Sequence, residues 1–127
     1  MAASGHQLIS LREIPGVTID AKETGDGITN TILVEKGKHI ELPIHVCLGI
    51  TEKTGIQRIQ TKLIIEEGAS ASFVAHCMFP FVESGEHRME ATIEIKESAR
   101  VRYNEIHYQG TRGGMVVVPK AIASVGP

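Results

Sequence analysis

The chain has 127 residues, of which 42% are hydrophobic and only 4% are aromatic, and its formal net charge is −2 at pH 7. This length fits one domain with a buried core, and the mixed charges form no basic patch that would bind nucleic acid. No apolar run approaches the roughly 20 residues of a membrane-spanning helix, and no signal-peptide pattern opens the chain, so we expect a cytoplasmic protein without a membrane partner.

The first 32 residues are the least regular part of the chain. The residues from Thr24 to Asn30 ("TGDGITN") have the composition of a loop. We expect residues 1–32 to form a first coil or a cap and residues 33–127 to form repeats, all within a single domain of residues 1–127.

From residue 33 onward the chain repeats itself. Gly37 recurs as Gly68, 31 positions later, and the place of Gly68 is taken by Ser98, 30 positions later. A period in this range is typical of a solenoid, in which each unit buries its apolar face against its neighbours. The three segments are Leu33–Cys47 ("LVEKGKHIELPIHVC"), Ile64–Met78 ("IIEEGASASFVAHCM") and Glu94–Tyr108 ("EIKESARVRYNEIHY").

Each repeat alternates apolar and polar residues after its turn, as a β-strand does. The predicted inward series are Ile40, Leu42 and Ile44, then Ala71, Phe73 and Ala75, then Val101 and Tyr103. Turn residues separate the strands at Glu52–Gly55, Glu66–Gly68, Glu83–Glu86 and Gly110–Gly114. The pattern predicts an all-β β-solenoid of about four coils, and the alternative fold is a β-sandwich whose strands are alike by chance.

The last segment, Met115–Pro127 ("MVVVPKAIASVGP"), begins a fourth unit. The end of a solenoid presents unpaired backbone groups. We therefore expect another chain, or further sequence, to cover it.

An ordered series of blocks runs through the repeats and resembles a known family. The blocks are a glycine-centred strand, the strand "LIIEEGA" at Leu63–Ala69, the "CxxP" segment "CMFP" at Cys77–Pro80 and the block Glu86–Gly110. Together they resemble the SufB/SufD family, scaffold subunits of the SUF iron–sulfur cluster assembly machinery. The resemblance implies a right-handed parallel β-helix and a non-enzymatic scaffold that carries a transient iron–sulfur cluster. It also implies a homo- or hetero-oligomer with a SufB/SufD-like subunit and an ABC-type ATPase partner, SufC.

The same resemblance singles out individual residues. Cys77 matches the cysteine that in SufB-type members is associated with accepting or passing sulfur, so it is the sulfur-acceptor candidate. Pro80 and His87 are the other candidate family-motif residues. The position of Cys77 on the strand face of Phe73 and Phe79 also fits a small core residue with a raised thiol pKa. Cys47 has the opposite parity and is expected to be more exposed.

Three histidines recur at one spacing. His45, His76 and His107 are each 31 positions apart. With 31 residues in every coil they would stack on one outer face at about 4.8 Å. Such a column could bind a metal ion with help from Cys47, but a solvent-facing ladder without ligand and a dimer contact are alternatives.

A step of 30 residues would instead align Cys47, Cys77 and His107. A one-residue bulge between Ala99 and His107 decides between the two registers. We favour the bulge, with Ile106 inward and His107 outward, because the other register turns the Glu105 carboxylate into the core.

The remaining candidates are weaker. His87 follows the turn "ESGE" and is expected at the surface. No catalytic triad, pair of acid and base carboxylates or phosphate-binding glycine loop is present, so we expect no enzymatic activity. Beside the scaffold hypothesis stand a small metal-binding β-domain that uses the histidine column and a purely structural interaction solenoid.

Overall fold

The computed structural model describes residues 1–10, 13–110 and 114–126, and these residues contain strands and no helix. Accordingly, no helix in these ranges could cross a membrane. Of the predicted turn Gly110–Gly114, residues 111–113 lie outside the described residues. The strands are β1 Ala2–Ser4, β2 Gln7–Ser10, β3 Val17–Glu23, β4 Gly27–Val34, β5 Ile44–Gly49, β6 Thr54–Ile65, β7 Ser70–Phe79, β8 Ser84–Ile95, β9 Arg100–Gln109 and β10 Met115–Val125.

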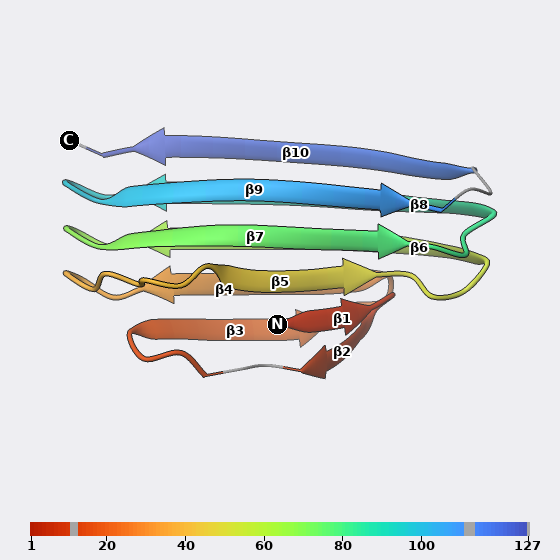
Figure 1. The fold of residues 1–127 in the computed structure, drawn as a ribbon, viewed down its shortest axis with the longest axis horizontal. Coiled ribbons are helices and arrows are strands. Elements are labelled where there is room, and N and C mark those ends of the chain that lie inside the picture. The colour runs from red at the N-terminus through yellow and green to blue at the C-terminus, as the bar shows by residue number, and fades with distance from the viewer. Residues whose placement is uncertain (11–12, 111–113, 127) are drawn as a thin grey trace.

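The strands form two facing sheets, and the chain crosses from one sheet to the other after every strand from β4 to β9. One sheet has the order β2-β1-β5-β7-β9 and the other β10-β8-β6-β4-β3. Strands of successive coils pair in parallel, which confirms the β-solenoid and excludes the β-sandwich. The path winds as a right-handed coil of about three turns, where about four were expected (Figure 1).

Antiparallel pairs at the N-terminal end add to both sheets. The β1–β2 hairpin continues the first sheet beside β5, and β3 pairs antiparallel with β4 at the edge of the second. The predicted loop Thr24–Asn30 is too long, because β4 already begins at Gly27. Alternation explains the difference, since Ile28, Asn30 and Ile32 all point into the core.

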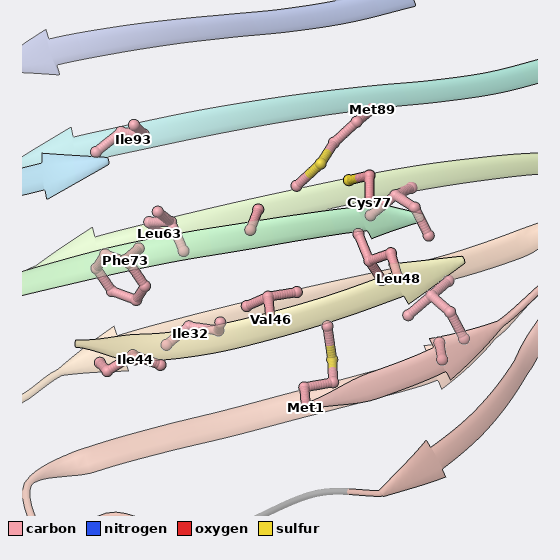
Figure 2. Packing of buried hydrophobic residues seen from close by; sticks show 14 of the residues in the cluster. Met1, Ile32, Ile44, Val46, Leu48, Leu63, Phe73, Cys77, Met89 and Ile93 are labelled. Carbon is pink, nitrogen blue, oxygen red and sulfur yellow. The ribbon is translucent and has the colours of Figure 1, made fainter. Parts of the chain in front are cut away.

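The core lies between the two sheets and follows the predicted alternation. On β7 every second residue is buried, including Phe73, Ala75, Cys77 and Phe79. Figure 2 shows apolar side chains from both sheets gathered in this space. Full burial of one phenylalanine side chain contributes up to about 3 kcal/mol, so the coils are held together mainly by this apolar interior.

One predicted inward residue is wrong. Leu42 is 78% exposed, although it stands between the inward-facing Ile40 and Ile44 in sequence. His39 pairs with Ser70, 31 positions later, whereas Ile44 pairs with Phe73, 29 positions later. Two extra residues therefore bend out of the first coil beside Pro43, which cannot donate a backbone hydrogen bond to a strand ladder.

The repeated turns superimpose along the solenoid. Gly37, Gly68 and Ser98 all have a positive φ, at 71°, 69° and 59°. The amide of Gly37 donates to the carbonyl of Glu67, and that of Gly68 donates to the carbonyl of Glu97. These three positions therefore correspond in structure as well as in sequence, because all three have the left-handed backbone conformation that glycine favours.

Candidate functional site

A chain of hydrogen bonds fixes the ring of His87 inside the solenoid. Gln57 Nε2 donates to the carbonyl oxygens of Gly5 and Gly49, at 2.9 and 3.0 Å. The opposite side of this amide, Oε1, lies 2.8 Å from His87 Nδ1. Because the amide oxygen can only accept, His87 Nδ1 carries the proton and His87 Nε2 carries a lone pair.

This lone pair lies in the protein interior. His87 is completely buried, and its Nε2 has no hydrogen-bond partner among the described residues. Burial, with a smaller effect from His107, lowers the pKa of His87 to about 4. The ring is therefore neutral at pH 7, and its Nε2 is available as a hydrogen-bond acceptor or a metal ligand.

Cys77 and His107 complete a group that we call the interior cluster, consisting of Cys77, His87 and His107. One ligand atom of each residue lies within 4.8 Å of the other two. Cys77 is completely buried and pairs with His107 across β7 and β9. Burial, assisted by the charges of Glu105 and Cys47, raises the pKa of the Cys77 thiol to about 12, so the thiol is protonated at neutral pH.

Glu105 borders the interior cluster on β9. The Tyr103 hydroxyl donates to Glu105 Oε1, and His107 Nε2 lies 3.4 Å from Glu105 Oε2. Burial and this hydrogen bond raise the pKa of Tyr103. The carboxylate thus has partners on both sides along its own strand face.

The predicted bulge between Ala99 and His107 is wrong. The pairing of β7 with β9 is continuous, so Ile106 is 54% exposed and His107 points inward with Glu105. An inward carboxylate is tolerated here because of its partners and because its side chain keeps 15% exposure at the last rung of this sheet.

The predicted histidine column is reduced to two residues on the outer face, His45 and His76, which we call the outer pair. His45 Nδ1 lies 3.2 Å from His76 Nε2, and the rings stack with centroids 5.4 Å apart. The exposed Cys47 is the strand partner of His76. His107 lies inside, and Cys47 does not align with Cys77 because of the 29-residue step between β5 and β7.

His87 was expected at the surface, and the structure places it in the core. The missed signal is parity, because His87 alternates with Met89, Ala91 and Ile93, all of which are buried. The same reasoning would have found Gln57, two positions before the buried Ile59. Pro80 is half-buried at the end of β7 and faces Gly110, where any Cβ would overlap the Pro80 carbonyl.

Comparison with known proteins gives two curated relatives. No family model matches the chain, and no solved structure matches it significantly. An iron–sulfur cluster assembly SufBD family protein of Methanocaldococcus jannaschii is 37% identical over 113 residues, which are 89% of this chain and 36% of the relative. One of Pyrococcus horikoshii with the same description is 29% identical over 107 residues, 84% of this chain and 33% of the relative. The chain spans about a third of the length of these relatives.

Proposed function

This chain is a SufB/SufD-like relative, and we propose that it takes part in iron–sulfur cluster assembly as a non-enzymatic scaffold. The observation that carries the proposal is the interior cluster, which gathers a cysteine and two histidines inside the solenoid. Thiolate and imidazole are the side-chain ligands of iron–sulfur centres. Here the iron, the sulfur and the transient cluster are cargo of the scaffold.

Cys77 is the proposed sulfur acceptor. Its thiolate attacks the outer sulfur of a donor persulfide, so that a new S–S bond forms at Cys77, the S–S bond of the donor breaks, and the donor leaves as a thiolate. No external oxidant is needed. Because burial raises the pKa of Cys77 to about 12 and lowers that of His87 to about 4, His87 is too weak a base to take the thiol proton. The proton leaves instead when the sulfur binds the iron cargo beside the free Nε2 of His87.

The proposal includes partners of two kinds. Ile106, Tyr108, Val116 and Ile122 are large apolar side chains that are about half exposed on β9 and β10, the last strands of their sheets. Such an exposed apolar edge suits a SufB/SufD-like subunit, in a homo- or hetero-oligomer. A SufC-like ATPase is the second proposed partner. Light scattering of the purified chain tests the first proposal, since a stable monomer at all concentrations would contradict self-association.

Reconstitution with iron and sulfide tests the scaffold function. Under anaerobic conditions the wild-type chain is expected to develop the visible absorbance of an iron–sulfur cluster. Cys77→Ser should abolish the absorbance, and the exposed-thiol variant Cys47→Ser should retain it. Equal absorbance in the wild type and in Cys77→Ser would refute a role for this thiol.

The outer pair supports a second candidate function, metal binding on the outer face. Its 3.2 Å nitrogen separation is close to the edge of a tetrahedron around an ion with Zn–N bonds of about 2.0–2.1 Å. If this function is correct, zinc binding survives Cys77→Ser and is lost in His76→Ala. The opposite result assigns the ion to the interior.

A further inference from the structure

The geometry points to a mononuclear site for a divalent first-row metal ion, iron(II) or zinc, held by Cys77 Sγ, His87 Nε2 and one ring nitrogen of His107. This inference deepens the proposed function and rests on it for the choice of iron as the natural ion. The existence of the site rests on the structure.

Two buried nitrogens without hydrogen-bond partners are the first support. His87 Nε2 and His107 Nε2 are both buried, and neither has a hydrogen-bond partner among the described residues. A buried polar atom without a partner costs about 1–3 kcal/mol, and an ion bound between these two nitrogens would remove that cost. A cation accepts the lone pair of His87 Nε2, which no protein donor satisfies.

The distances are the second support. In a tetrahedral site with bonds of about 2.0–2.1 Å to nitrogen and 2.3 Å to sulfur, neighbouring ligand atoms lie about 3.3 to 3.6 Å apart. The ligand atoms of the interior cluster lie within 4.8 Å of one another. Side-chain movements of about 1 Å therefore close the site around an ion.

Glu105 can supply the fourth ligand of the metal ion, and its negative charge helps to neutralise the ion. Its Oε2 lies 3.4 Å from His107 Nε2, which matches a ligand edge of such a tetrahedron. A divalent ion with one thiolate and one carboxylate forms a neutral group. Neutrality removes much of the cost of burying each charge separately.

Gln57 is a positioning residue for this site. It holds the proton of His87 on Nδ1, so that Nε2 always faces the cluster as a lone pair. Hydrogen bonds of this kind orient metal-binding histidines, and their loss weakens binding about 10- to 100-fold. Gln57 is itself anchored by two backbone carbonyls, so the orientation is built into the fold.

The side of β9 is the least buried side of the site. The side chains of His107 and Glu105 keep 18% and 15% exposure, whereas Cys77 and His87 are fully buried. An ion reaches His107 first and then the deeper ligands. On binding, the Cys77 thiol loses its proton and the sulfur binds the ion, without any redox change.

Cobalt(II) titration of the chelator-treated protein is the decisive experiment. We expect one ion per chain, the bands of tetrahedral coordination and a thiolate-to-cobalt charge-transfer band, with zinc displacing the cobalt. Calorimetry in buffers of different ionisation enthalpy should show at least one proton released per ion. Cys77→Ala should remove the charge-transfer band, and His107→Ala, on the least buried strand of the site, should weaken binding at least about 10-fold.

Matched variants separate this site from the alternatives. Gln57→Leu removes the acceptor for His87 Nδ1 and should weaken binding about 10- to 100-fold, while Gln60→Leu, at an exposed position of the same strand, should bind cobalt as the wild type does. His76→Ala, in the outer pair, should bind as the wild type does. The inference is overturned if the wild type binds no cobalt, or if binding survives Cys77→Ala and is lost in His76→Ala. Cobalt binding without iron–sulfur cluster formation would overturn the proposed function alone. Cluster formation by a wild-type chain that binds no single cobalt ion would overturn the inference alone.

Discussion

His87 should make the folded protein lose stability as the pH falls from about 6.5 to about 4. The pKa of this buried histidine is lowered from 6.5 to about 4 on folding, so between these values the unfolded chain binds a proton that the folded chain excludes. Stability therefore rises with pH in this window and is fully regained above it. A difference of about 2.5 pKa units corresponds to about 3 kcal/mol.

Urea unfolding monitored by circular dichroism at several pH values, with chelator present, measures this loss. Carboxylates also titrate in this range, so the informative quantity is the difference between the wild type and His87→Gln. Glutamine can still donate to Gln57 Oε1 but does not titrate. The difference in unfolding free energy between the wild type and His87→Gln should change by about 3 kcal/mol between pH 7 and pH 4. The control is His39→Gln, at an exposed position. A difference that stays constant with pH would refute the assignment of His87 as a buried neutral imidazole.

Three further predictions concern thiols and turns. Cys47 is exposed and Cys77 is buried, so a thiol reagent should modify one cysteine rapidly and the second only when the chain unfolds; two rapid thiols would contradict the burial of Cys77. Ser98→Gly should raise the unfolding free energy by about 1 kcal/mol in urea titrations, because Ser98 has a φ of 59°. Gly27→Ala should lower it by at least about 2 kcal/mol, because a Cβ there overlaps the Arg58 carbonyl, whereas Gly25→Ala meets no atom and should cost less than about 1 kcal/mol.

Much of the fold could be predicted because strand alternation and the glycine-centred turns are both local signals. The parity of β7 placed Cys77 in the core, and the structure agrees. The length of each coil was not predictable in the same way. The two extra residues before Ile44 keep the inward and outward faces unchanged, so alternation cannot reveal an even insertion. The insertion shows itself in the exposure of Leu42 and in the strand register, which pairs Cys47, and not His45, with His76.

The interior cluster required information that no single strand contains. Cys77 and His107 lie on one sheet and His87 on the other, so their approach depends on how the two sheets face each other. The bulge was wrongly favoured because Glu105 was treated as a carboxylate without partners. Tyr103, two positions away on the same strand face, donates to it. An i, i+2 check of polar residues would have retained the continuous register.

Burial of Cys77 and a role in sulfur transfer conflict only while the thiol acts alone. A thiol with a pKa near 12 is almost never a thiolate at neutral pH, and the thiolate is the nucleophile. His87, with a pKa lowered to about 4, is too weak a base to remove this proton, but a metal ion bound to His87 Nε2 replaces it and so opposes the effect of burial. The hydrogen bond from His87 Nδ1 to Gln57 therefore matters for sulfur as well as for metal, because it holds the lone pair toward the thiol in either case. The nucleophilicity of Cys77 is thus a property of the whole interior cluster, and the apolar core that suppresses the thiol also prevents its unspecific oxidation.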